Sequence, residues 1–344
     1  MDGIPRLVYG RTTVLLELRI REDPDGLQDY EGGEWDMKKL VSTLGLDKAE
    51  WLKYRKRGIG GSDAGAVCGL NPYRTAMQVY QDKITEDTED LDNEAMRQGR
   101  EFEDYVARRF MEATGKKVRR ANAMFYDEKH PFMLADVDRM VVNENAGLEC
   151  KTASPYLADK WEDGRIPLHY QLQCHHYMSV CNTDAWYIAV LIYGREFKYY
   201  RLERDEDMLA DLIRIEEDFW KNRVQAGILP DPDGSKLADR VIAEYFRRSV
   251  PGKILLAGFN EKLDRRQELS EKMAELETEK RLIEQELKLY LGEAEIAENE
   301  QYRVSWKSVS SNRIDEKRLK EEKPEVYKQY QKTVESRRFT VKVA

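Results

Sequence analysis

The sequence predicts an α/β fold in which a central mixed sheet is flanked by helices and is followed by a long charged helix. The chain has 344 residues, enough for about two structural units. Its hydrophobic content of 41% suffices for a packed core, and its charged content of 35% is typical of long solvated helices. Helical and strand-like patterns alternate irregularly along the middle of the chain, which favours a mixed sheet over regular parallel β-α-β units.

Periodicity and turn residues predict the elements in order. Apolar residues at helical spacing indicate helices, alternation indicates strands, and glycines or turn-rich segments separate them. An amphipathic run over 94–114, closed by Gly115, is the clearest helix. The predicted elements are helices at 48–57 and from Ser62, the helix at 94–114, a hairpin of strands 132–142 and 147–153 with its turn at 143–146, a helix at 167–180, a hairpin of strands 186–193 and 196–202 around Gly194, and a helix at 206–225.

These elements divide the chain into a leader, a core, a linker and a C-terminal part. The leader, residues 1–47, contains a strand-like segment at 12–20 and a loose stretch at 23–36. The core spans residues 48–230, and the linker spans 231–259. Residues 260–344 are expected to form a coiled-coil helix and a small strand-helix-strand tail.

The C-terminal part carries a heptad pattern. Leu269, Met273, Leu276, Ile283 and Leu287 recur at spacings of 4, 3, 7 and 4, with Lys280 at the skipped position. This spacing predicts a coiled-coil seam of about three heptads.

Beyond the heptads, apolar and basic residues alternate in 302–309 and in 338–343, on either side of a helical stretch at 316–331. If the two segments pair as strands, four cations lie on one face. Such cations commonly keep a sheet edge soluble. The alternative is that they contact the backbone of duplex DNA.

Composition excludes several classes of protein. The net charge of −8 argues against a protein that coats nucleic acid by bulk charge, although a local basic patch remains compatible with it. The four cysteines, which form no CxxC pair, make a disulfide scaffold, a zinc ribbon or an iron–sulfur cluster unexpected. His175 and His176 point to different sides of a helix and cannot chelate one ion together. No export or membrane segment is recognisable, so a cytoplasmic location is expected.

Asp138, Glu149 and Lys151 form the main candidate for chemistry. Two acids on adjacent strands of a hairpin can point to the same face of a sheet. Paired carboxylates suit a hard cation such as Mg²⁺, and the ammonium of Lys151 could stabilise charge that develops on a phosphate. Taken alone, the pattern is weak, and a solvated hairpin face explains it better.

Other segments add to this candidate. Glu103 lies on the helix at 94–114, and Tyr170 and Gln173 lie three residues apart on one side of the next predicted helix. The segment RKRGIGGSDAG contains Arg55, a glycine turn and Ser62, which is placed as a helix N-cap. A capped helix start beside basic residues suits a phosphate, although the neighbouring Asp63 would repel one.

These blocks together resemble a known family. The order WLKYRKRGIGGSDAGAVCGLNPY, QGREFEDYVARRF, ADVDRMVVNENAGLECKTAS and HYQLQCHHYM is similar to that of the YqaJ-type phage recombinase nucleases. These are relatives of bacteriophage lambda exonuclease in the PD-(D/E)XK superfamily. The resemblance covers residues 48–230, and its most specific parts are the GIGGSD and GLECK blocks. It implies the restriction-endonuclease-like core of that superfamily.

The resemblance implies a metal site. Asp138 and Glu149 match the metal-binding carboxylates, with the backbone carbonyl of Cys150 as a further ligand. Glu103 matches the helix glutamate that assists metal binding. Lys151 matches the lysine of the E-x-K signature. The implied cofactor is Mg²⁺, with Mn²⁺ as an alternative, at two ions.

Three further positions follow from the resemblance. Gln173 matches the glutamine of a Y-x-x-Q helix beside the active site. Arg55 and Ser62 match residues that hold the 5′-phosphate of a DNA end. One departure affects the site, because lambda exonuclease has glycine where this chain has Arg139, and this leaves Asp136 as a lesser candidate ligand.

The implied function is a metal-dependent exonuclease that digests double-stranded DNA from the 5′ end and leaves 3′ single strands for phage-type recombination. The implied partners are DNA ends, a single-strand annealing recombinase and further copies of the chain, in the cytoplasm of a bacterial host. One alternative is a restriction or repair endonuclease of the same superfamily. The other is a non-cleaving protein that binds DNA ends or partners through its coiled coil.

Overall fold

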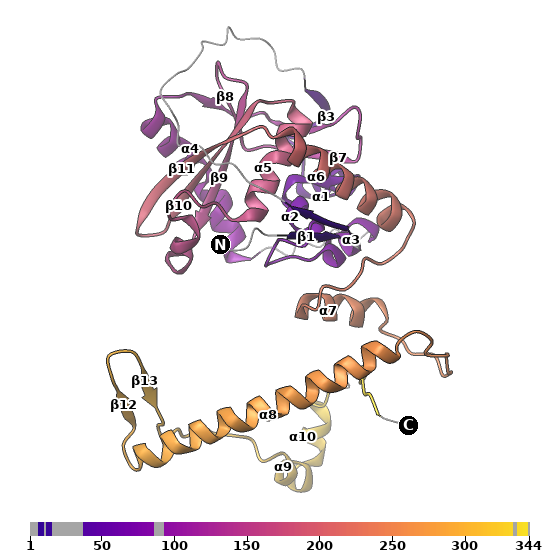
Figure 1. The fold of residues 1–344 in the computed structure, drawn as a ribbon, viewed down its shortest axis with the longest axis vertical. Helices are drawn as coiled ribbons and strands as arrows, with labels where there is room; N and C mark the ends of the chain where they lie inside the picture. Colours follow the sequence, from indigo (N-terminus) through magenta and orange to yellow (C-terminus); the bar gives the residue numbers. More distant parts are fainter. Residues whose placement is uncertain (1–5, 10–11, 16–36, 86–92, 333–335, 343–344) are drawn as a thin grey trace. The chain divides into compact units, whose positions relative to one another are not determined.

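The computed structural model describes residues 6–9, 12–15, 37–85, 93–332 and 336–342. The chain separates into two units, Met1–Tyr245 and Phe246–Ala344, and each is described by itself (Figure 1). The predicted loose stretch at 23–36, residues 16–20 of the predicted first strand and Val343 lie outside the described residues.

The first unit contains two mixed sheets flanked by helices, which confirms the predicted α/β class (Figure 1). In both sheets one neighbouring pair of strands is parallel and the other pairs are antiparallel. A separate antiparallel pair, β1 (Arg6–Tyr9) and β2 (Thr12–Leu15), precedes them. The strand order of the larger sheet is β11 (Glu196–Glu203), β10 (Ala185–Ile192), β9 (Ala146–Ala153), β8 (Arg139–Val141) and β5 (Val118–Arg119). The strand order of the smaller sheet is β3 (Lys38–Ser42), β6 (Ala123–Tyr126), β7 (Met133–Asp136) and β4 (Ile59–Gly60).

Strand β10 has the sequence AWYIAVLI because both of its faces are covered. Trp186 and Ile188 belong to the main core cluster, to which the helix at Leu168–Cys181 (α5) contributes. The intervening Tyr187 belongs to a second cluster with Phe110, which lies on the helix at Glu94–Thr114 (α4). Alternate side chains of one strand therefore anchor α5 and α4 on opposite faces of the larger sheet.

Helix α4 begins and ends where the sequence predicts. The side chain of Asn93 accepts a hydrogen bond from the backbone N–H of Met96 at 3.0 Å, and Gly115 closes the helix with φ of 72°. Helix α5 is buried from Gln171 to Cys181, which explains why its sequence has no clear polar face. The other helical segments of this unit are α1 (Lys48–Arg55), α2 (Gly61–Val67), α3 (Ala76–Ile84), η1 (Pro155–Trp161), α6 (Glu206–Phe219), η2 (Trp220–Gln225) and α7 (Lys236–Tyr245).

Helix α2 lies directly against α5 because two of its residues lack side chains. A Cβ atom at Gly61 would come within 2.5 Å of the ring of Tyr177, and one at Gly65 would come within 2.6 Å of His169 Cβ. The glycines of the GIGGSDAG segment therefore allow close helix packing, and they fix α2 beside the side chains that α5 presents.

Three expectations about the first unit need correction. The predicted strand 132–142 is divided between β7 and β8, which belong to different sheets, although β8 and β9 do form the predicted hairpin. Strand β3 lies within the expected leader. It nevertheless belongs to the first unit, because it pairs with β6 at the edge of the smaller sheet. Residues 236–245 of the expected linker form α7, whose Ala238 and Val241 pack on Met77 of α3.

The second unit is built around α8 (Asn260–Leu291), a helix of 32 residues. The predicted helix is confirmed, but the predicted terminal sheet is wrong. Strand β13 (Arg303–Ser305) pairs with β12 (Ile296–Glu298), a close neighbour in the chain, and residues 338–342 form no strand. The short helices α9 (Glu316–Glu322) and α10 (Pro324–Gln329) follow. Among the described residues, no helix combines the length and the apolar character needed to span a membrane.

Candidate active site

The structure brings Asp138 and Glu149 together at the start of the β8–β9 hairpin. Arg139 of β8 is paired with Leu148 of β9, so the residue before β8 lies beside the residues that follow Leu148. The backbone N–H of Cys150 donates a hydrogen bond of 2.7 Å to Asp138 Oδ2. The register of this hairpin therefore positions the two carboxylates that the sequence predicted as a pair.

Two side chains bind the same carboxylate oxygen of Glu149. Lys151 Nζ lies 2.5 Å from Glu149 Oε1, and Gln173 Nε2 donates to the same oxygen at 2.7 Å. The other oxygen, Oε2, is buried and has no hydrogen-bond partner among the described residues. A buried carboxylate oxygen without a partner is costly unless a further group, such as a cation, occupies the space next to it.

Lys151 and Gln173 are themselves held by aromatic residues of α5. Lys151 Nζ lies 4.7 Å from the centre of the Tyr170 ring, and Gln173 Nε2 also donates to Tyr177 Oη at 3.1 Å. Burial alone would lower the pKa of Lys151, but Glu149 and Asp138 outweigh it and raise that pKa. Lys151 therefore carries a positive charge. The Y-x-x-Q spacing places Tyr170 and Gln173 on the same side of α5, where they contact Lys151 and Glu149 of β9.

The carboxylates repel one another. Burial raises the pKa of Asp138 well above its ordinary value, and the charges of Glu149 and Glu103 raise it further. Burial likewise raises the pKa of Glu149, although Lys151 opposes this shift. The site thus contains more negative charge than Lys151 neutralises, and a divalent cation would relieve the repulsion.

Arg139, the residue at which the sequence departs from lambda exonuclease, occupies part of this site. It is 5% exposed, and its Nη1 donates to Glu103 Oε1 at 2.5 Å and to the backbone carbonyl of Asp138 at 2.6 Å. Its Nη2 donates to Asp104. The sequence identified Arg139 only as an irregularity, whereas in the structure it holds the helix glutamate that was predicted to assist metal binding.

An open hollow of about 170 Å³ lies at one side of this site. Glu103, Asp136, Asp138 and Arg139 line it, so these three carboxylates are accessible to a ligand, whereas Glu149 is buried and does not line the hollow. Trp51 Nε1 donates to Asp136 Oδ2 at 2.6 Å, and burial raises the pKa of Asp136. Trp51 thus occupies one oxygen of Asp136, as the N–H of Cys150 occupies one oxygen of Asp138.

The residues present fit a hard divalent ion. Asp138 and Glu149 supply oxygen ligands, one of those oxygens is buried without a partner, and Mg²⁺ often binds proteins through only one or two carboxylates. Among the described residues, no cluster of three or more histidine, cysteine or acidic side chains has the geometry of a complete metal site. The pairing of Glu103 with Arg139 accounts for the missing third carboxylate.

The second predicted site lies around Arg55 and Ser62. Arg55 Nη2 donates to Ser62 Oγ at 2.9 Å, so the structure places these two side chains in contact. The guanidinium of Arg55 also lies over the ring of Trp51, at 5.1 Å from its centre. Since Trp51 binds Asp136, one aromatic side chain connects Arg55 with the hollow above Asp138.

Two expectations about this second site are corrected. Ser62 is not the N-cap, because α2 begins at Gly61 and the carboxylate of Asp63 accepts a hydrogen bond from the N–H of Gly60 at 3.1 Å. Asp63 does not act as an exposed repelling charge either. It is fully buried, Lys83 Nζ lies 2.8 Å from its Oδ2, and Arg74 donates to its other oxygen.

The surroundings of Asp63 are net positive. Although burial acts to raise the pKa of Asp63, the charges of Lys83, Arg74 and Arg55 keep it well below its ordinary value. Asp82 adds a second carboxylate, which lies 3.1 Å from Arg74 and 3.8 Å from Lys56. Four cations thus surround two carboxylates, an arrangement that holds Arg55 in place and leaves excess positive charge for an anion.

The histidines of α5 have structural contacts rather than the geometry of a metal site. His176 is fully buried, with Nδ1 at 2.9 Å from Glu216 Oε1 and Nε2 at 2.9 Å from the carbonyl oxygen of Leu134. His175 Nδ1 lies 2.9 Å from the carbonyl oxygen of Gln171. His176 thereby joins α5 to α6 and to β7.

The family model and the relative in Bacillus subtilis agree on the family. The model of the YqaJ-like viral recombinase domain matches residues 50–184. The uncharacterized protein YqaJ of Bacillus subtilis (strain 168) is 36% identical over 308 residues, which cover 88% of this chain and 97% of that protein.

Two solved structures are also similar. An alkaline exonuclease (LHK-Exo) from Laribacter hongkongensis has 18% identity and a TM-score of 0.46 over 52% of this chain and 93% of its own. A phage related exonuclease from Haemophilus somnus 129PT has 11% identity and a TM-score of 0.40 over 52% of this chain and 99% of its own. The chain belongs to the family of YqaJ-like viral recombinase proteins.

Proposed function

We propose that this protein is a metal-dependent exonuclease that digests double-stranded DNA from the 5′ end. The observation that carries the proposal is the arrangement of Asp138, Glu149 and Lys151. Asp138, which lines the open hollow, and the buried Glu149 repel one another beside a cation, and one Glu149 oxygen lacks a partner among the described residues. Few structural roles require such a cluster, whereas hydrolysis of a phosphodiester requires both metal ligands and a fixed positive charge.

Asp138 and Glu149 would hold the metal, either Mg²⁺ or Mn²⁺. We extend this ligand set to the backbone carbonyl of Cys150 and, for a second ion, to Glu103. When bound, such ions supply an activated water and stabilise the charge on the phosphate.

The other side chains position these groups. Gln173 fixes the orientation of Glu149 through the hydrogen bond to Oε1. Lys151, held over the ring of Tyr170, would place its ammonium against a phosphate oxygen and stabilise the negative charge of the transition state. Because Lys151 is buried and paired, it stays protonated throughout the working pH range.

The polarity of digestion would come from the second site. We propose that Arg55 and Ser62 bind the 5′-phosphate of a DNA end, supported by the excess of cations around Asp63. The product would be a duplex with a 3′ single-stranded overhang. Such strands are substrates for a single-strand annealing recombinase, in agreement with the viral recombinase family, and the reaction would take place in the cytoplasm of a bacterial host.

The test compares linear with closed circular duplex DNA. With Mg²⁺, the purified chain should degrade linear DNA carrying 5′-phosphates, leave circular DNA intact and lose activity in EDTA. Asp138→Ala serves as the inactive control, and Arg97→Gln, an exposed change on the first turn of α4, should retain full activity.

Each other outcome would contradict the proposal in a different way. Cleavage of circular DNA would indicate an endonuclease of the same superfamily. Binding of DNA ends without cleavage, in the presence of either Mg²⁺ or Mn²⁺, would indicate a non-cleaving protein.

A further inference from the structure

Helix α8 exposes the apolar stripe that its heptads predict. The side chains of Leu269, Met273 and Leu276 are 45%, 70% and 64% exposed, and those of Ile283 and Leu287 are 52% and 40% exposed. All 32 residues of α8 are described, and only Leu291 is buried. A stripe of this length in water is stabilised when another helix covers it.

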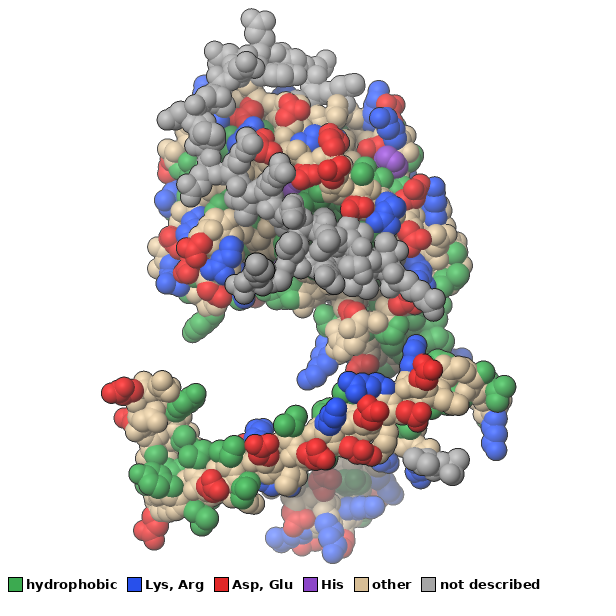
Figure 2. Space-filling view, in the orientation of Figure 1, with side chains coloured by type: hydrophobic (Ala, Val, Ile, Leu, Met, Phe, Trp, Pro, Cys, Tyr) green, Lys and Arg blue, Asp and Glu red, His purple; other side chains and the backbone are tan. Residues whose placement is uncertain are grey.

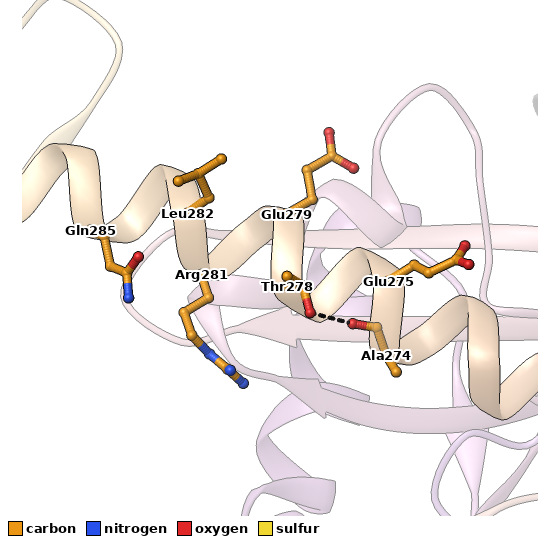
Figure 3. Close-up of a pocket in the computed structure, with 7 residues that line it drawn as sticks. All are labelled: Ala274, Glu275, Thr278, Glu279, Arg281, Leu282 and Gln285. Carbon is orange, nitrogen blue, oxygen red and sulfur yellow. Dashed lines mark hydrogen bonds between the residues drawn. The ribbon is translucent and has the colours of Figure 1, made fainter.

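The rest of the helix surface is mostly polar. Figure 3 shows one such face, where Glu275, Glu279, Arg281 and Gln285 project from the helix together with Leu282. On this face the hydroxyl of Thr278 donates to the carbonyl oxygen of Ala274, within the same helix. Charged and apolar side chains are interspersed along α8 in the space-filling view (Figure 2). The heptad stripe, which Lys280 interrupts once, is the surface on which apolar side chains recur at coiled-coil spacing.

The charges within and beside the stripe distinguish between possible partners. In heptad notation, Arg266, Met273, Lys280 and Leu287 occupy the a positions, and Lys262, Leu269, Leu276, Ile283 and Tyr290 occupy the d positions. A parallel, in-register pair places each a residue against its own copy. Arg266 and Lys280 would then each face an identical cation, and Glu279 would lie beside the partner's Glu284. Lys262, at a d position, would likewise face its own copy, whereas Lys272 would lie beside the partner's Glu277. Parallel pairing is therefore opposed by like charges at four levels and favoured by one opposite-charge contact, which the twofold symmetry repeats.

Antiparallel pairing removes these conflicts. If the pair is centred between Met273 and Leu276, Met273 packs against the partner's Leu276. Lys280 then lies against the partner's Leu269, and Arg266 lies against the partner's Ile283. The aliphatic part of each cationic side chain can cover the opposite apolar residue while its charge reaches water.

The flanking g positions become complementary in the same arrangement. Lys272 lies beside the partner's Glu279, and Arg265 lies beside the partner's Glu286. Since the pair has twofold symmetry, each contact occurs twice. The same sequence that produces repulsion in a parallel pair produces four opposite-charge contacts in an antiparallel one.

We propose that α8 associates with α8 of a second copy of this chain as an antiparallel coiled coil centred between Met273 and Leu276. This inference does not depend on the nuclease chemistry proposed above. A second copy of α8 is the partner that fits, because the same helix carries both the apolar stripe and the complementary charges that flank it.

The first experiment measures the mass of the full chain in solution by sedimentation equilibrium. The expected mass is an even multiple of the chain mass, and Leu276→Glu, which places a carboxylate against the partner's Met273, should halve it. Leu282→Glu is the matched control, because Leu282 lies on the same helix outside the stripe and its exposure of 55% is similar to the 64% of Leu276, and it should leave the mass unchanged. A wild-type monomer, or a Leu276→Glu variant of unchanged mass, would overturn the proposal.

The second experiment tests the orientation through Glu279→Lys. In the antiparallel pair this change replaces two attractive contacts with Lys272 by repulsive ones, so the dissociation constant should rise on the order of tenfold. In a parallel pair it would remove the repulsion from the partner's Glu284 and tighten association. Combining it with Lys272→Glu should restore the wild-type affinity. Tighter association of the single variant, or failure of the double variant to recover, would overturn the antiparallel arrangement.

Discussion

Arg139 Nη1 lies 2.5 Å from Glu103 Oε1 and donates at 2.6 Å to the backbone carbonyl of Asp138. A guanidinium thus lies between the helix glutamate and the aspartate that begins the β8–β9 hairpin. The positive charge of Arg139 partly compensates the negative charge of this cluster, and its hydrogen bond restrains Glu103.

Removal of this internal cation should strengthen metal binding. We expect Arg139→Gln to bind Mn²⁺ on the order of tenfold more tightly than the wild type, because the field of the carboxylates is then less compensated. Isothermal titration calorimetry without DNA measures this directly. Arg97→Gln, which removes an exposed guanidinium from the same helix as Glu103, should have wild-type affinity. Equal or weaker binding by Arg139→Gln would show that Arg139 does not compete for these carboxylates.

Lys151→Ala should separate binding from chemistry. The ammonium contacts Glu149 and would stabilise a phosphate, so its loss should reduce the cleavage rate about 10²–10³-fold. Binding of Mn²⁺ and of DNA should be retained, because Lys151 is not a metal ligand and its loss removes a positive charge beside Glu149. Asp138→Ala and Glu149→Ala should abolish both cleavage and metal binding while keeping the circular dichroism spectrum. Near-normal turnover by Lys151→Ala would exclude its assigned role.

The Arg55–Ser62 pair should discriminate between DNA ends. If it binds a terminal phosphate, the wild type should digest 5′-phosphorylated duplexes faster than duplexes with a 5′-hydroxyl. Arg55→Gln and Ser62→Ala should reduce this preference more than they reduce the rate on 5′-hydroxyl ends. Parallel rate measurements on the two substrates decide the matter, and a wild type that shows no preference contradicts the assignment.

The His176–Glu216 pair should make the fold less stable as the pH rises. Burial alone would lower the pKa of His176, but Glu216 outweighs it and the pKa lies above the ordinary 6.5. Burial also raises the pKa of Glu216 above 4.5. The folded state therefore retains protons that the unfolded chain releases, and the stabilisation present below pH 6.5 is lost as the pH rises through the folded pKa of His176.

Denaturant titrations between pH 6 and pH 8.5 measure this effect. Glu216→Gln should flatten the pH dependence relative to the wild type by up to about 1.4 kcal/mol per pH unit. Glu217→Gln, on the exposed side of the same helix, should keep the wild-type slope. Identical slopes for the wild type and Glu216→Gln would show that the pair does not titrate in this range.

The sequence predicted local features better than long-range ones. Helix α4 could be predicted because its start at Asn93, its apolar stripe and its end at Gly115 are all encoded within the helix and its flanks. The hairpin of β8 and β9 could be predicted from its turn. The division of 132–142 between two sheets could not, because it depends on partners distant in the chain: β7 pairs with β6 and β4, whereas β8 pairs with β9 and β5.

The predicted site shows the same limit. Asp138, Glu149, Lys151 and Gln173 were identified because motif spacing and strand register place them together. The sequence did not reveal the contacts that Arg139, Trp51 and Lys83 make beside the predicted sites. The residues that they contact lie 36, 85 and 20 positions away in the chain, respectively. Asp63 was assigned the wrong effect for the same reason, since its neutralising partners lie on a later helix and loop.

The change of sheet between β7 and β8 has a consequence for how the protein loses activity. Asp138 lies at the junction, and Tyr177 and Gln173 of α5 contact Asp136 on one sheet and Glu149 on the other. Any opening between the two sheets would therefore separate Asp136 from Glu149 and displace Asp138, which lies between them, while most of the secondary structure persists. The proposed activity thus depends on the two sheets staying together, and inactivation on heating should precede the loss of helical signal.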